Sequence, residues 1–291
     1  MRSTKLLLSI ALAILAAPAV AAAQVAGLPA ASSGGSVARD LDMAQKRAYW
    51  SGGKTRSFVL GTLEGGIFYY RPQLAIGYGK PHWHWFGAES QTRFSIGSAS
   101  QYFGVRGALP NVELRLGSRY SWAANESYLD RRDAYTDDQI GFDDNQNSRY
   151  VTGEAELTGF FPFLGGAITF LATSLYVAGV PEKLNVFENQ LHVVAQAPWL
   201  WRTRAGYVRT VFVDGLQLGA AAEVIGNPER EHLVVRVGPQ LGAALTHHLD
   251  ASLSIMAVVA SRDSLHLKGN DIGQFGFRYR WASGDPFPEF P

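Results

Sequence analysis

The 291-residue chain contains no cysteine. This absence excludes disulfide bonds, thiolate metal ligands and a cysteine nucleophile. It also excludes a lipid-anchored lipoprotein, because that anchor is attached to a cysteine that follows the apolar leader. An exported protein without disulfides needs another source of stability, and a closed hydrogen-bonded sheet is one such source.

Charge of one sign and long apolar segments are also scarce. The 26 Lys and Arg residues nearly balance the 25 Asp and Glu residues, for a net charge of +1. The composition therefore gives no reason to expect a nucleic acid or an acidic partner. Beyond residue 23, no segment approaches the roughly 18 consecutive apolar residues of a transmembrane helix. Hydrophobic residues still make up 47% of the chain, so they must be distributed along it in another way.

The first 23 residues have the three-part form of a secretory signal peptide. Arg2 and Lys5 form a positive head, an apolar run covers 6–17, and small residues at 19–21 or 21–23 offer cleavage sites. Cleavage at the second site would leave Gln24 as the first residue of the mature chain. We predict that residues 1–23 are a signal peptide. The alternative, a retained anchor, is disfavoured because the run is shorter than the roughly 20 residues of a spanning helix.

From about Arg56 onward, apolar and polar residues alternate with a period of two. In the clearest segment, 112–122, the two faces are Val112, Leu114, Leu116, Tyr120 and Trp122 against Glu113, Arg115, Gly117, Arg119 and Ser121. The same pattern recurs in segments 151–161, 216–224, 233–245 and 251–259. Successive side chains of a strand point to opposite faces. Each segment is therefore predicted to be a strand between an apolar and a polar medium.

The last such segment covers residues 274–281. Its aromatic positions are Phe275, Phe277, Tyr279 and Trp281, and they alternate with Gln274, Gly276, Arg278 and Arg280. A closing strand of this form resembles the final strand of bacterial outer-membrane β-barrels. The resemblance extends, as a broad class, over residues 56–281 and implies an all-β, antiparallel up-and-down transmembrane barrel. It also implies outer-membrane lipid and lipopolysaccharide as surroundings, and insertion machinery that reads the last strand.

A soluble β-sandwich or a soluble periplasmic β-protein is the competing interpretation, since it too has one apolar strand face. The polar strand faces of this chain carry Glu, Arg, Gln, Thr and Gly, whereas Lys is nearly absent. Beyond the N-terminal region, lysine occurs only at Lys54, Lys80, Lys183 and Lys268, all in expected turns or loops. Paired Glu and Arg with small glycines suit a narrow polar lumen, in which each inward charge needs a partner. The pattern favours the membrane barrel.

Turn and loop lengths predict about twelve strands. We expect five strands before the long acidic loop 123–148 and seven after it, at 56–63, 66–79, 83–94, 100–107, 111–122, 149–161, 167–179, 198–212, 216–226, 232–245, 250–260 and 273–281. An even number is required, and ten strands is the alternative. The expected organisation is a signal peptide at 1–23, a flexible periplasmic lead-in at 24–54 with a possible short helix at 38–50, a barrel at 55–281 and a tail at 282–291.

Charged residues on the polar faces are candidates to line the lumen. They are Glu89, Arg93, Arg106, Glu113, Arg115, Arg119, Glu154, Glu156, Arg202, Arg204, Glu223, Arg236, Arg278 and Arg280. Arg202 and Arg204 could select anions in a pore. The simpler expectation is that they pair with lumen glutamates such as Glu154, Glu156 or Glu223.

Two patterns resemble metal sites. Asp143, Asn145 and Asn147, with Glu154 at the twelfth position, match the oxygen-ligand spacing of a calcium loop. Ser148 stands where the loop wants glycine, so a solvated acidic loop is the favoured interpretation. In the run 82–85, two histidines could share a metal from one strand face, but an aromatic girdle of His and Trp near the membrane surface is favoured. No cofactor is expected.

We expect no enzyme activity, although barrel-borne lipid hydrolases are an alternative. Outer-membrane phospholipases and lipid A deacylases use a strand-borne His two residues from Ser. The only comparable pair is Ser264 and His266, in reversed order and in an expected loop. The expected function is a porin-like passive channel for small solutes or a structural, surface-exposed barrel in the outer membrane. A lipid hydrolase and a soluble β-protein remain the alternatives.

Overall fold

The computed structural model describes residues 50–66, 69–140, 146–211, 216–272 and 276–284. The expected signal peptide and most of the tail lie outside these residues. So does the lead-in up to residue 49, which contains nearly all of the expected helix at 38–50. In the described part of the chain, no helix is long and apolar enough to cross a membrane.

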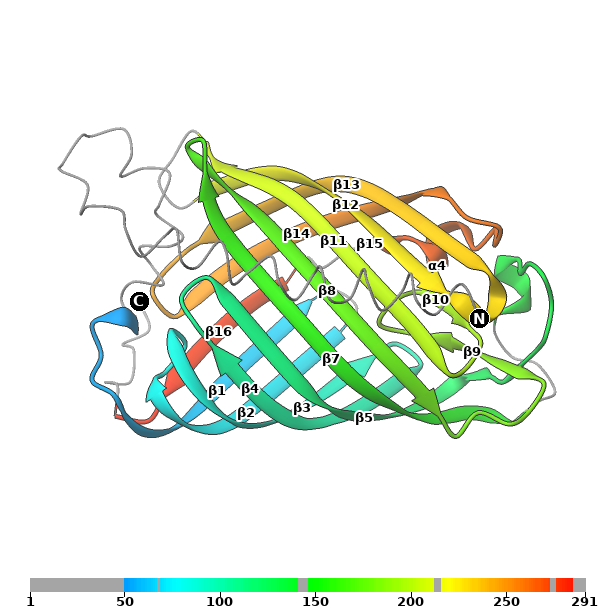
Figure 1. Ribbon diagram of the computed structural model, residues 1–291, viewed down its shortest axis with the longest axis horizontal. Helices are drawn as coiled ribbons and strands as arrows, with labels where there is room; N and C mark the ends of the chain where they lie inside the picture. Colours follow the sequence, from blue (N-terminus) through cyan, green and yellow to red (C-terminus); the bar gives the residue numbers. More distant parts are fainter. Residues whose placement is uncertain (1–49, 67–68, 141–145, 212–215, 273–275, 285–291) are drawn as a thin grey trace, which may run out of the picture. The chain divides into compact units, whose positions relative to one another are not determined.

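Within the described residues, twelve strands form one antiparallel sheet that closes on itself (Figure 1). They are β1 (Arg56–Gly66), β2 (Tyr69–Lys80), β3 (His84–Ser95), β4 (Ser98–Ala108), β5 (Val112–Ser127), β7 (Asn147–Phe163), β8 (Gly166–Ala178), β11 (Trp199–Thr210), β12 (Leu216–Asn227), β13 (His232–Ala244), β14 (Leu249–Ala260) and β16 (Gly276–Ala282). Neighbours in sequence pair in space, and β16 pairs with β1 from Gly66↔Gly276 to Leu60↔Ala282. The predicted up-and-down barrel of about twelve strands is confirmed, and the ten-strand alternative is wrong.

The connections differ in length at the two ends of the barrel. At one end, here called the turn end, the connections are short: 80–84, 108–112, 163–166, 210–216 and 244–249. β1 begins and β16 ends there. The other end, the loop end, carries three long connections, 127–147, 178–199 and 260–276, together with three shorter ones. All three long connections therefore lie at the same end of the barrel.

The two faces of the sheet differ in chemistry. Outward positions carry exposed apolar side chains, among them Leu74, Ile76 and Phe86 at 62–66% exposure. Inward positions carry buried charged residues such as Glu89 and Glu223. A slip of one residue in pairing would exchange these faces, so the period-two pattern fixes the register of the strands.

The long connections contain secondary structure of their own. β6 (Leu129–Asp130), β9 (Leu184–Glu188) and β10 (Val193–Ala195) form a small sheet in the order β10-β9-β6. The short helices are η1 (Asp137–Gln139), η2 (Pro228–Arg230) and α4 (His266–Gly269), and β15 (Asp271–Ile272) pairs with β14. The labels β9, β10 and α4 lie together at one end of the barrel in Figure 1. The loop end is therefore covered by folded structure.

One sequence expectation fails at the turn end. Trp85, expected in an outer aromatic girdle, is only 4% exposed. Its ring packs edge-on against Phe58, 5.6 Å away. Both belong to a buried apolar cluster at the turn end that also contains Trp50 and Leu60. The reason is parity: Trp85 is separated by an even number of residues from the inward Glu89, so the two share a face.

Candidate functional site

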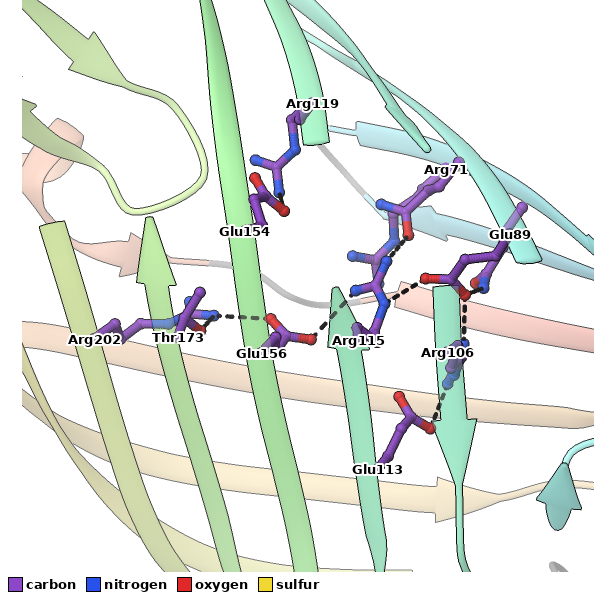
Figure 2. A network of polar contacts seen from close by, with 12 residues as sticks. Arg71, Glu89, Arg106, Glu113, Arg115, Arg119, Glu154, Glu156, Thr173 and Arg202 are labelled. Atoms are coloured by element: carbon purple, nitrogen blue, oxygen red, sulfur yellow. Dashed lines mark hydrogen bonds and ion pairs between the residues drawn. The ribbon is translucent and has the colours of Figure 1, made fainter. Parts of the chain in front are cut away.

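A chain of ion pairs crosses the inner wall from β3 to β11 (Figure 2). Its centre is Glu89, whose fully buried carboxylate accepts hydrogen bonds from Arg115 Nε at 2.6 Å and Arg106 at 3.2 Å. Gln73 donates a third bond at 2.6 Å. A carboxylate with no exposure to water needs such partners, because its desolvation would otherwise cost several kcal/mol.

The chain continues in both directions from these two arginines. Arg106 also binds Glu113 at 2.5 Å. Arg115 reaches Glu156 at 3.2 Å, and Glu156 in turn lies 3.7 Å from Arg202. Arg202 therefore pairs with a lumen glutamate, as the sequence predicts, and that glutamate is Glu156.

A second group surrounds Glu223, which is also fully buried. Arg204 lies 2.7 Å and Arg236 2.9 Å from its carboxylate, while Arg202 lies at 4.0 Å. Arg204 also binds Asp271 of β15 at 2.6 Å. One carboxylate thus balances guanidinium groups from β11 and β13, on either side of its own strand.

The remaining predicted residues have individual partners. Arg119 binds Glu154 and lies 3.6 Å from Glu188 of β9. Arg93 donates to Ser95 Oγ at 3.2 Å and stacks over the Tyr69 ring at 5.2 Å. At the β1–β16 seam, Arg278 binds Glu64 at 2.8 Å, and on the other side of β16, Arg280 binds Asp250 of β14.

Several members of these groups were missed by the sequence reasoning. They are Glu64, Arg71, Glu188, Asp250 and Asp271. Glu64, Arg71 and Asp250 lie at inward strand positions, so the same parity argument applies to them. Glu64 lies just beyond the expected strand 56–63, whereas Arg71 and Asp250 lie within expected strands. Glu188 and Asp271 belong to elements within long connections, and no barrel periodicity extends that far.

A hairpin made of β9, β10 and the turn between them, residues 184–195, lies inside the barrel at the loop end. We call it the plug hairpin. Its apolar side chains join inward residues of five consecutive barrel strands in one buried group, the inner cluster: Tyr128, Tyr150, Leu175, Val177, Val186, Leu191, Val193, Ala195, Leu200, Ile225 and Val234. Val186 and Ala195 are fully buried. The hairpin is therefore held mainly by the burial of apolar surface.

The opposite face of the plug hairpin is also covered. Phe187 and Val194 pack with Leu129, Tyr135, Ile140 and Leu265, here called the outer cluster. These partners come from the connections 127–147 and 260–276. Successive residues of the hairpin thus face the inner cluster and the outer cluster in turn. The hairpin belongs to the connection 178–199, and the other two long connections pack against it.

Polar contacts tie the plug hairpin to nearly opposite walls. Arg236 of β13 donates to the carbonyl oxygens of Leu191 at 2.7 Å and His192 at 3.0 Å. Arg119 of β5 faces Glu188 from the other side. In the order of strands around the barrel, β5 and β13 are five steps apart. The hairpin therefore spans the interior.

At the turn end the interior holds an open cavity of about 450 Å³. Arg71, Arg106, Arg115, Arg278 and Arg280 are among its lining residues. The Arg278 side chain is 38% exposed and that of Arg71 28%, whereas the carboxylates behind them, Glu64 and Glu89, are 9% and 0% exposed. The cavity surface consequently presents several guanidinium groups, together with the carboxylates of Glu113 and Glu156 that also line it.

The two histidines of the 82–85 run do not share a metal site. His82 lies in the β2–β3 turn, where its Nε2 is 3.1 Å from the carbonyl oxygen of Trp281, and His84 is exposed at the start of β3. Burial lowers the pKa of His82 to about 3, and the positive charges of Arg280 and Arg106 act in the same direction. Among the described residues, no three His, Asp or Glu side chains are grouped as metal ligands.

The calcium-loop pattern is only partly within the described residues. Asp143 and Asn145 lie outside them. Asn147 Nδ2 donates to the carbonyl of Ala124 at 3.1 Å, and Glu154 is engaged by Arg119. Glu154 is therefore an inward residue of the barrel wall, and its carboxylate is paired with Arg119.

Comparisons with solved structures give distant likenesses. The NanC porin is 10% identical, with a TM-score of 0.35, over 78% of this chain and 98% of that one. A loop-L8 deletion mutant of OmpT, an outer membrane protein of Vibrio cholerae, is 10% identical, with a TM-score of 0.34 and the same coverage. No protein-family model and no curated protein matches the sequence.

Proposed function

We propose that this chain is an outer-membrane β-barrel of a Gram-negative-type envelope, closed at its loop end in the state described here. In this proposal the barrel has a structural or surface role, and it conducts solutes only when the plug hairpin is displaced. The observation that carries the proposal is the plug hairpin itself, packed between the inner and outer clusters and tied to nearly opposite walls.

Placement in a membrane is supported by the outer surface. Leu74, Ile76, Phe86, Phe103 and Val105 are each at least 55% exposed and lie on outward positions of neighbouring strands. A continuous apolar surface of this kind is a liability in water, but it suits the hydrocarbon region of a bilayer. Closure through β1 and β16 also satisfies the backbone polar groups that lipid cannot.

The remaining parts of the proposal follow the sequence. Export would use the signal peptide at 1–23, and the aromatic last strand ending at Trp281 would be read by barrel insertion machinery. The short turns would then face the periplasm and the long connections the cell surface, as is usual for such barrels. The arginine-lined cavity would open toward the periplasm.

Two measurements test membrane placement. The mature chain should fractionate with outer membranes, and it should migrate differently on a gel before and after boiling, as a closed barrel does. Recovery of the folded chain in the periplasmic fraction without detergent would favour the soluble alternative.

Conductance in a planar bilayer tests closure. The full-length barrel, folded in detergent, should give few discrete current steps. Replacement of residues 185–195 by a short Gly-Ser linker should produce regular steps, because it removes the apolar side chains with which the plug hairpin fills the interior. A matched control replaces the exposed segment 131–134 by the same kind of linker and should stay silent. Regular steps from the unaltered chain would contradict closure at the loop end.

A further inference from the structure

Three side chains with complementary chemistry meet at the loop end, outside the lumen network. Ser261 directly follows β14, His232 is the first residue of β13, and Asp263 lies two residues beyond Ser261. The Ser261 Oγ is 3.2 Å from His232 Nε2. On the other side of the ring, His232 Nδ1 is 3.9 Å from Asp263 Oδ2.

The surrounding hydrogen bonds determine that the Ser261 hydroxyl donates its proton toward the His232 ring. The backbone N–H of Asp263 donates to Ser261 Oγ at 3.0 Å. The hydroxyl is then free to donate its own proton to His232 Nε2, which leaves the ring proton on Nδ1. The Asp263 carboxylate lies 3.9 Å from Nδ1, beyond hydrogen-bond distance, so it acts on the ring through its charge. Arg230 holds the Asp263 carboxylate through two contacts of 2.8 Å. The order is nucleophile, base and orienting carboxylate.

This group borders a cavity of its own. Ser261 and Asp263 line a space of about 450 Å³, distinct from the cavity at the turn end. Its apolar lining includes Val193, Val234, Val258, Leu265 and Leu267. These apolar side chains suit a hydrocarbon chain, and the polar side chains that share the lining, Ser261 and Asn270 among them, suit the ester group.

An amide side chain also lines this cavity. Asn270 lines the same cavity, and its Oδ1 accepts the backbone N–H of Val258 at 2.8 Å. Its amide nitrogen carries two N–H donors, of the kind that stabilise an oxyanion.

We propose that Ser261 and His232 form a serine acyl-hydrolase site for carboxylic esters with an apolar acyl chain, with Asp263 as the positioning residue. The Ser261 oxygen attacks the acyl carbon while its proton passes to His232 Nε2. Collapse of the tetrahedral intermediate breaks the ester C–O bond, and the leaving alcohol takes that proton. Water then attacks the acyl-serine and gives a proton to His232. As the bond between the acyl carbon and the Ser261 oxygen breaks, that proton passes to the serine oxygen, and the carboxylic acid is released.

The pair is hidden in the sequence because 29 residues separate its members. Pairing of β13 with β14 brings the start of one strand beside the end of the other. The Ser264 and His266 pair named from the sequence lines the same cavity, but the oxygen that His232 contacts belongs to Ser261.

Active-site labelling tests the proposal on the unaltered protein. The full chain, folded in detergent, is treated with a fluorophosphonate, and the modified peptide is mapped by mass spectrometry. We expect label on Ser261, and turnover of p-nitrophenyl esters that rises from acetate to longer acyl chains. Absence of label, or label only at other residues, overturns the proposal without any need for a variant.

Variants separate the roles of the residues. Ser261→Ala and His232→Gln should each lower ester turnover by about a hundredfold or more. Asp263→Asn should lower kcat with little change in KM, as expected for a residue that acts through His232. Ser174→Ala, at an exposed serine of β8 outside this cavity, is the matched control and should keep turnover. Equal turnover in Ser261→Ala and the unaltered chain, with both showing the gel shift of a closed barrel, overturns the proposal.

Discussion

The two ends of the barrel differ in what fills them. At the loop end the interior is occupied by the plug hairpin, which buries apolar side chains on both of its faces. At the turn end the interior remains a cavity, and its surface presents guanidinium groups. The same twelve strands thus enclose an interior filled by the plug hairpin at one end and an open cavity with arginines in its lining at the other.

Connection length accounts for the difference. An extended chain reaches at most about 3.3–3.6 Å per residue, so turns such as 108–112 or 163–166 cannot cross the interior of a barrel this wide. The connection 178–199 is long enough to enter the barrel, form a hairpin and return. We infer that the loop end is closed because its connections are long enough to fold into the interior, and that the turn end stays open because its connections are too short to do so.

The largest difference in stability is expected between substitution of a glutamate near the loop end and substitution of a glutamate near the turn end. Glu223, in the half nearer the loop end, is fully buried and shared by Arg204 and Arg236. Glu223→Gln leaves Arg236 facing a neutral side chain, while Arg204 keeps Asp271, and should destabilise the barrel by about 3–5 kcal/mol. Glu113 lies near the turn end, is 22% exposed and binds only Arg106. Glu113→Gln should cost less than about 1 kcal/mol.

Urea unfolding of both variants in detergent, followed by tryptophan fluorescence, measures these differences. Similar losses in the two variants would show that the halves are equally tolerant, and would remove the basis for the contrast.

A second difference concerns the plug hairpin alone. Leu191 is 2% exposed in the inner cluster. Leu191→Ala should weaken docking of the hairpin by about 2 to 3 kcal/mol, the lower part of the range for buried leucines. Hydrogen exchange should accelerate at residues 184–195 and stay unchanged in the strands near the turn end. Leu267→Ala, at a leucine that is 73% exposed, is the control; an equal effect there would contradict a docked hairpin.

At the turn end, a pH dependence is expected from His82. Its pKa in the folded chain, about 3, lies below the ordinary histidine value near 6.5. Between these two pH values the unfolded chain binds a proton that the folded chain does not. The contribution of neutral His82 is therefore complete above about pH 6.5 and is lost as pH falls toward 3, by at most about 1.4 kcal/mol per pH unit.

His82→Gln should flatten that part of the stability profile, measured by urea unfolding at pH 5 and pH 7.5. His84→Gln, at the exposed histidine two residues away, is the control. An identical pH profile in the His82 variant would contradict burial as the cause.

Much of the wall could be predicted from the sequence, because one rule governs it. The alternation at 112–122 assigned Glu113, Arg115 and Arg119 to the same face, and the structure places all three inward. The pairing of Arg202 with Glu156 followed from the need of an enclosed charge for a partner. Parity also explains the error at Trp85: the girdle was assigned by residue type, although the position faces inward.

The plug hairpin could not be predicted in the same way. β9 and β10 contain five and three residues, too few for periodicity to distinguish a strand from an apolar loop. Their place inside the barrel depends on contacts with five different strands. The approach of Ser261 to His232 depends likewise on where two strands end, and strand boundaries are the least certain part of a sequence pattern.

The smallest expected effect concerns the charges of the turn-end cavity once the plug is removed. In the variant whose residues 185–195 are replaced, Arg278→Gln should lower the preference for chloride over potassium, read from the reversal potential in a KCl gradient. The change should stay below about fivefold, since a unit charge 4 Å away contributes about 1 kcal/mol in water-like surroundings. Glu113→Gln removes the opposite charge from the same cavity and should raise the preference. A shift of the same sign in both variants would mean that the turn-end cavity does not set selectivity, and that the rim left by the missing hairpin does.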